Sequence, residues 1–259
     1  MNTQQNVPVI DYQPLQVQEA ARVGVLEPFS WLRAGFATFV ELKFLAISFG
    51  LLFAIIGASI SYAAANNAQL LFAFWSGFLL VAPVLAMATY HMARNRDAGQ
   101  QVDLGSCSKL LRSQLGNTAL LVLFLSIVMI AWIRISTLAV AVYSGGAGFN
   151  LAMGSSLLDP TNLGLLATLG VVTAGFSLVI FSLLAWAMPM LSTGKHGFAV
   201  SVVSSLKAVV SQPAPMLVWG FLVASLTLLS MASFFIAFVV VFPWLGFATW
   251  EGYKRLFER

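Results

Sequence analysis

The fold depends on how one apolar stretch is threaded, residues 215–250: PMLVWGFLVASLTLLSMASFFIAFVVVFPWLGFATW. As a single helix this stretch would be about 54 Å long, whereas a hydrocarbon core is only about 30 Å thick. Two shorter helices fit better, with a turn near residues 230–233. The stretch is therefore predicted to cross the membrane twice and to return the chain to the side from which it came.

The composition of the whole chain is that of an integral membrane protein. Apolar residues make up 59% of the 259 residues, and charged residues make up only 8%. Because lipid offers no partner for unpaired backbone amides, an all-α fold is expected. Four further spans precede the final stretch, so that six transmembrane helices are predicted. These four are residues 44–63, 70–92, 117–143 and 162–191.

Lysine and arginine residues indicate the topology. Twelve of the thirteen lie outside the spans and fall in alternate gaps, with Arg33, Arg112 and Lys207 among them. Under the positive-inside rule, these gaps and both termini are cytoplasmic. A five-span alternative would instead place the three cations of the tail outside. The predicted domains are a polar cytoplasmic tail, residues 1–27, and a six-helix transmembrane domain, residues 28–259.

A weak threefold repeat supports the six-span count. Each pair of spans is preceded by a leucine, a cation and a small residue, and the second span of each pair contains a proline. The prolines are Pro83, Pro189 and Pro243. A proline removes one amide hydrogen bond, so each second helix is predicted to be kinked. Three such kinks would line a cytoplasmic cavity in a small transporter or channel, or would simply shape a solid bundle.

Each repeat is predicted to begin with an amphipathic cytoplasmic helix, and the first is the clearest. Between residues 28 and 43 one face is apolar, and the opposite face is polar. The apolar face holds Phe29, Leu32, Phe36, Phe39 and Val40, and the polar face holds Ser30, Arg33, Thr38 and Glu41. Such a helix is expected to lie in the membrane interface or to dock a partner helix.

Arg134 is the exception among the cations because it falls inside the third span. An arginine at that depth costs several kcal/mol unless it is paired or reaches the interface. Our hypothesis is a contact with Asp159, the only acidic residue predicted on the outer side. The alternatives are that Arg134 extends to the outer surface beside Trp132, or that it binds an anionic headgroup or a subunit carboxylate.

Residue patterns typical of catalysis and cofactor binding are absent from the sequence. Neither His91 nor His196 has a second histidine on its span, and no glycine-rich phosphate loop or catalytic triad is present. The basic residues follow the cytoplasmic rim and form no stripe, which argues against nucleic-acid binding. We therefore expect a lipid-embedded protein that is not an enzyme and has no cofactor, no metal and no nucleic-acid partner.

Three segments resemble a family of uncharacterised bacterial integral membrane proteins: WLRAG (31–35), WIRI (132–135) and FPWLGFATWEGYK (242–254). Some members are labelled as cytochrome c oxidase subunits. This resemblance implies an accessory subunit or assembly factor in the bacterial inner membrane, with a terminal oxidase as the candidate partner. The family's closing motif commonly has two histidines where this chain has Phe247 and Glu251. That departure speaks against a metal or haem role, and a small transporter or channel remains the alternative function.

The predicted topology can be tested with a reporter enzyme fused after Arg259. An even number of crossings places this terminus with the other cationic segments, so the reporter is expected to be active in the cytoplasm. A fusion that is active only on the outer side would contradict the six-span prediction.

Overall fold

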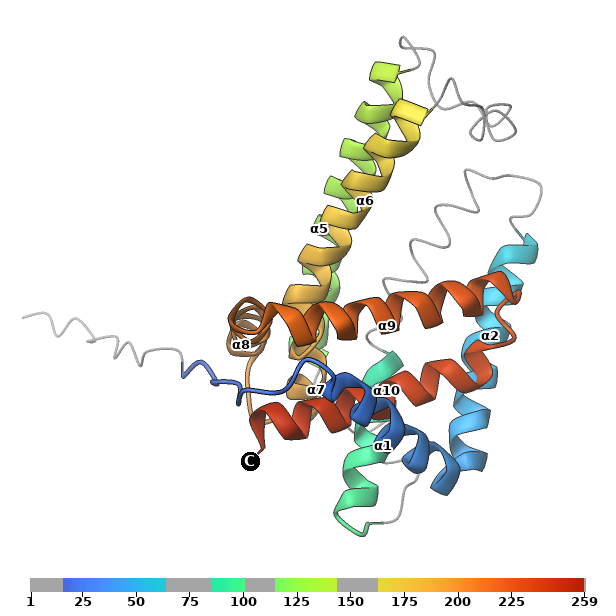
Figure 1. Ribbon diagram of the computed structural model, residues 1–259. Helices are drawn as coiled ribbons and strands as arrows, with labels where there is room; N and C mark the ends of the chain where they lie inside the picture. The colour runs from blue at the N-terminus through green and yellow to red at the C-terminus, as the bar shows by residue number, and fades with distance from the viewer. Residues whose placement is uncertain (1–15, 64–84, 101–114, 144–162, 259) are drawn as a thin grey trace, which may run out of the picture.

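The computed structural model describes residues 16–63, 85–100, 115–143 and 163–258 (Figure 1). All regular secondary structure in these residues is helical, which confirms the expected all-α class. The helices are α1 (Glu27–Glu41), α2 (Lys43–Ala63), a helical segment at 85–97, α5 (Leu115–Tyr143), α6 (Leu163–Leu184), α7 (Ala187–Ser192), α8 (Phe198–Ser211), α9 (Pro213–Ala232) and α10 (Phe238–Phe257).

Several described helices are long and apolar enough to cross a membrane. They are α2, α5, α9 and the range Ala167–Ser192, which covers most of α6 and all of α7. The chain is thus a multi-spanning membrane protein. Most of the predicted second span, including Pro83, lies outside the described residues, as do Arg112 and Asp159. The six-span count, the repeat and the cytoplasmic termini therefore remain predictions.

The apolar stretch at residues 215–250 divides into two helices, as expected from its length. Helix α9 ends at Ala232, and α10 begins at Phe238 and runs back in the opposite direction (Figure 1). In the turn between them, Phe234 and Phe235 have positive φ angles of 53° and 68°. The hydroxyl of Ser233 accepts a hydrogen bond of 3.0 Å from the amide of Ala237, just before α10 begins.

Helix α10 forms the centre of the packed region, and glycine residues allow other helices to approach it closely. A Cβ atom on Gly35 of α1 would lie 2.6 Å from the Cα atom of Ala248. Similarly, a Cβ on Gly246 would overlap the side chain of Thr89 in the segment 85–97. Backbones therefore meet at distances that only small residues permit.

Three fully buried tryptophans pack against one another in the core. The ring of Trp31 makes edge-to-face contacts with Trp186 and Trp219, at centroid distances of 5.4 and 5.6 Å. The indole N–H of Trp186 points to the sulfur atom of Met216, 3.3 Å away. Such aromatic pairs contribute about 0.5–1.5 kcal/mol each beyond the burial of their area.

The predicted fourth span is interrupted near Pro189, where α6 ends and α7 begins. At this break the hydroxyl of Ser205 on α8 accepts a hydrogen bond of 3.1 Å from the amide of Trp186. The same hydroxyl donates a hydrogen bond of 2.9 Å to the carbonyl of Ser182. One serine thus bridges an amide and a carbonyl four residues apart, which would bond directly in an unbroken helix.

The structure corrects the predicted faces of α1. Thr38, assigned to the polar face, is only 1% exposed, and its hydroxyl donates to the carbonyl of Ala34 at 3.3 Å. The packed face also holds Trp31 and Gly35. Phe29 and Phe36 of the predicted apolar face are about half exposed, which agrees with the expected contact with the membrane interface or a partner helix. The prediction was wrong for Thr38 because a threonine can satisfy its hydroxyl within its own helix and still be buried.

Helices α5 and α6 form a hairpin that projects away from the other helices (Figure 1). Only 11% of the apolar window of α5 is buried within the structure. Contacts at the base of the hairpin join it to α7 and α8. Most of its surface is therefore available to lipid or to another membrane helix.

Substitution of Gly35 by alanine tests the close crossing of α1 and α10. The added methyl group meets backbone atoms that no side-chain rotation can move, so we expect a loss of roughly 1–3 kcal/mol in unfolding free energy. Gly170→Ala on α6 is the matched control, because nothing lies within 4 Å of a Cβ at that position. The control should be neutral or slightly stabilising in the same thermal unfolding measurement. Equal stability of the two variants would contradict the crossing.

Candidate functional site

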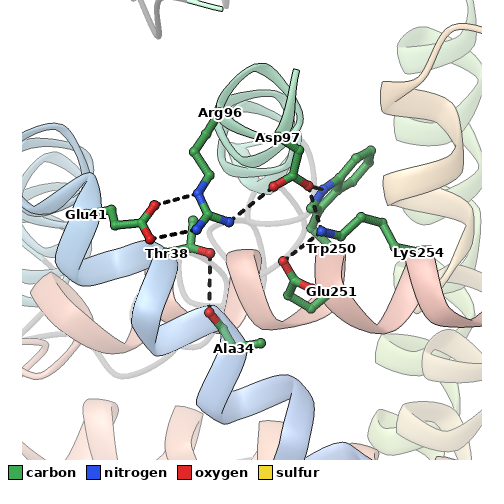
Figure 2. Close-up of polar contacts among 8 residues, drawn as sticks. All are labelled: Ala34, Thr38, Glu41, Arg96, Asp97, Trp250, Glu251 and Lys254. Carbon is green, nitrogen blue, oxygen red and sulfur yellow. Dashed lines mark hydrogen bonds and ion pairs between the residues drawn. The ribbon is translucent and has the colours of Figure 1, made fainter. Parts of the chain in front are cut away.

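A polar junction connects α1, the segment 85–97 and α10 (Figure 2). The guanidinium of Arg96 donates two hydrogen bonds to the carboxylate of Glu41, from Nε at 2.6 Å and from Nη2 at 2.7 Å. This paired geometry is the strongest arrangement available to an arginine and a carboxylate. It connects the end of α1 to the end of the segment 85–97.

Asp97 is the central acceptor of this polar junction (Figure 2). Its carboxylate accepts hydrogen bonds from the indole N–H of Trp250 at 3.0 Å and from the ammonium of Lys254 at 2.6 Å. Arg96 adds a third contact at 3.1 Å, and Lys254 also pairs with Glu251 at 2.9 Å. The same carboxylate therefore holds the segment 85–97 against α10.

The environment of Asp97 favours its ionised form. Burial raises the pKa of this carboxyl, but the hydrogen bonds from Lys254 and Trp250 and the charges of Lys254 and Arg96 outweigh it and lower the pKa below its usual value. The hydrogen bond from Arg96 likewise lowers the pKa of Glu41. Both carboxylates are therefore fully charged at neutral pH, and the junction is intact there.

Further cations near the ends of these helices also have structural partners. Arg255 on α10 contacts the carboxylate of Glu27 and donates to the hydroxyl of Ser30 at 2.9 Å. Arg94 donates to the carbonyl of Thr193 at 3.1 Å, just after α7 ends. These pairings were missed at the sequence level, where the cations were considered only as markers of topology.

The three cations predicted for the cytoplasmic interface differ in their surroundings. Arg33 is exposed on α1, and Lys207 on α8 pairs with Glu19 at 2.8 Å. Arg112 lies outside the described residues. The structure does not bring Arg33 and Lys207 together into one site.

Of the predicted kink prolines, Pro189 and Pro243 are described, and both are buried. Pro189 lies in α7, just after the break in the fourth span, and Pro243 lies inside α10. Their packed surroundings favour the solid bundle over a cavity lined by these two residues.

Arg134 is exposed on α5, and Trp132 beside it is half-buried. No acidic residue occurs anywhere in α5 or α6, and no ion pair within the described ranges reaches Arg134. Arg134 lies nine residues before Tyr143, the end of α5, which corresponds to about 13.5 Å along the helix. The proposed partner Asp159 is outside the described residues, so that contact stays a prediction.

Asp97→Asn tests the polar junction, because asparagine keeps an acceptor for Trp250 but loses the charge. Allowing for solvent screening, we expect a loss of about 1–2 kcal/mol in stability at neutral pH, measured as a lower Tm. In the parent protein this stabilisation is complete above the ordinary Asp pKa of about 3.9 and is lost as the pH falls through the lowered pKa of Asp97. The variant should lack that acid-dependent loss.

The control for this test is Glu19→Gln, which removes the exposed pair with Lys207 and should leave the Tm unchanged. An Asp97→Asn protein with unchanged Tm and unchanged acid sensitivity would show that Asp97 does not hold the helices together.

Part of the chain is similar to a known protein family. A model of a protein family described as "Predicted integral membrane protein (DUF2189)" matches residues 71–193, a range that contains α5, α6 and α7. No curated protein and no solved structure matches the chain. The closing motif at residues 242–254 lies outside the matched range, and the family description names no oxidase. Over residues 71–193 the chain thus matches the DUF2189 family of uncharacterised integral membrane proteins, which confirms the family resemblance expected from the sequence.

Proposed function

We propose that this protein is a non-catalytic accessory subunit or assembly factor of a membrane complex, and that the α5–α6 hairpin docks against a partner membrane helix. The observation that carries this proposal is the exposure of Arg134 on α5, together with the lack of any acidic residue in either helix of the hairpin, α5 or α6. A carboxylate on the partner helix would complete the contact.

The energetic cost of Arg134 supports a partner. An arginine near the centre of a span costs about 2.5–3.5 kcal/mol by insertion scales, and less as it approaches the interface. An ion pair with a membrane-embedded carboxylate offsets part of this cost, because the surrounding dielectric is low. The hairpin also leaves most of its surface free for such a helix, since little of α5 is buried.

The rest of the structure suits a rigid platform more than a moving transporter. The polar junction and the tryptophan core fasten α1, α7, α9 and the segment 85–97 around α10. Pro189 and Pro243, which would line a transport cavity in the alternative function, are buried in this packed region. A terminal oxidase of the bacterial inner membrane is our candidate partner, from the family resemblance.

Affinity purification in mild detergent tests the docking contact. We expect Arg134→Ala to reduce the amount of co-purified partner at least roughly tenfold, equivalent to about 1.4 kcal/mol. Arg134→Lys keeps the charge but loses the planar guanidinium, so it should show an intermediate loss. Arg33→Ala is the matched control, because it removes an exposed cation from α1 and should leave the partner in place. Haem absorbance in the purified sample would identify an oxidase.

Two outcomes would contradict the proposal. A colourless homo-oligomer with no stoichiometric partner would favour the transporter alternative. Rescue of Arg134→Ala by a second substitution, Asp159→Ala, in an assay of membrane accumulation would instead show that the partner of Arg134 is Asp159 of the same chain.

A further inference from the structure

Residues 16–26 include an extended segment that lies against two helices of the bundle. Figure 1 shows this segment, in blue, passing between α8 and the C-terminal end of α10 before α1 begins. These residues belong to the stretch predicted as a polar tail, yet they make specific contacts. Most of these contacts are hydrogen bonds to backbone atoms of the segment.

Gln212 makes the most informative of these contacts. It lies at the junction of α8 and α9 and is only 9% exposed. Its side-chain oxygen accepts a hydrogen bond from the amide of Val23 at 2.8 Å, and its side-chain nitrogen donates to the carbonyl of Ala21 at 2.9 Å. The amide group of one glutamine thus pairs with the backbone of the segment as a neighbouring β-strand would.

Two more acceptors continue this pattern along the segment. The hydroxyl oxygen of Ser204, a fully buried residue of α8, accepts from the amide of Gln18 at 2.9 Å. The carbonyl of Leu256, in the last turn of α10, accepts from the amide of Ala21 at 2.8 Å. Carbonyls in the last turn of a helix have no partner within the helix, so this one is available to an added strand.

The side chains of the segment contribute less to its binding than its backbone does. Ala20 and Val23 are partly buried against the core, which limits these two positions to small residues. The ion pair of Glu19 with Lys207 joins two side chains that are 81% and 52% exposed, and such surface pairs contribute little. The site therefore selects an extended backbone with small side chains at two places.

The segment is connected to α1 through an exposed link. A Cβ on Gly24 would have nothing within 4 Å, and Val25 and Leu26 are 50% and 71% exposed. Trp31 and the packed face of α1 begin only beyond this link. The segment can therefore leave its site without removing α1 from α10.

From these contacts we infer that Ser204 of α8, Gln212 at the α8–α9 junction and Leu256 of α10 form a binding site for an extended polypeptide segment. Residues 17–23 are its occupant, and they bind reversibly, so that the segment leaves the site and returns while α1 stays packed on α10. This docking mode is addition of a strand through main-chain hydrogen bonds. The inference is independent of Arg134, which lies on the hairpin.

The experiment uses the full chain with a protease site inserted between Gly24 and Val25, purified in detergent. After cleavage and washing, a fluorescent peptide of residues 16–24, QVQEAARVG, should bind saturably, as measured by anisotropy. Before cleavage the peptide should bind at least tenfold more weakly, because the linked segment competes at high effective concentration. Gln212→Ala should weaken binding to the cleaved protein roughly tenfold, because two hydrogen bonds are lost.

Lys207→Ala is the matched control on the same helix and should change the affinity less than about threefold, because its ion pair is exposed. A peptide methylated on the nitrogens of Ala21 and Val23 provides a test with the unmutated protein, and it should not bind. Equal binding of the methylated and unmethylated peptides would overturn the inference. It would also be overturned by a cleaved segment that never exchanges, even with excess peptide.

Discussion

The packed region depends on the close approach of helix backbones to α10. In a membrane the hydrophobic effect contributes little to association between helices, so contact distance and interhelical hydrogen bonds decide which helices stay together. Gly35 meets Ala248, Gly246 meets Thr89, and Gly252 lies against the rings of Trp31 and Trp186. Because these contacts follow one helix, α10 determines where its neighbours lie and where their polar ends meet.

Close packing also supplies hydrogen-bond partners for the backbone groups that are left free where a helix is interrupted. Pro189 cannot donate an amide hydrogen bond, and the chain departs from a regular helix just before it. Ser205 bonds to the amide of Trp186 and the carbonyl of Ser182 because α8 packs against this break. Ser204, its neighbour on the same buried face, faces the N-terminal segment instead. One short helix therefore supplies hydroxyl groups both to the break in the fourth span and to the proposed peptide site.

The positions of the helices could be predicted from the sequence better than the contacts between them. Apolar length alone predicted α2, α5 and the division of residues 215–250 into α9 and α10, since a span has a fixed minimum length. The pairing of Arg96 with Glu41 joins residues 55 positions apart, and no periodicity points to such a contact. The burial of Thr38 was also missed. Residue type alone predicts an exposed polar side chain, but the hydroxyl of Thr38 bonds to its own helix and can therefore be buried.

Four described cations near helix ends differ from Arg134 in what satisfies them. Arg94, Arg96, Lys254 and Arg255 lie near helix ends, and each finds a carboxylate or a carbonyl within the chain. Arg134 lies inside an apolar window, where an unsatisfied charge costs more than it does at the rim. The chain pairs these four rim cations internally and leaves the costlier Arg134 exposed on its least buried hairpin. This contrast is most simply explained if the group that satisfies Arg134 comes from outside the described helices, which is why we place the partner contact on the α5–α6 hairpin.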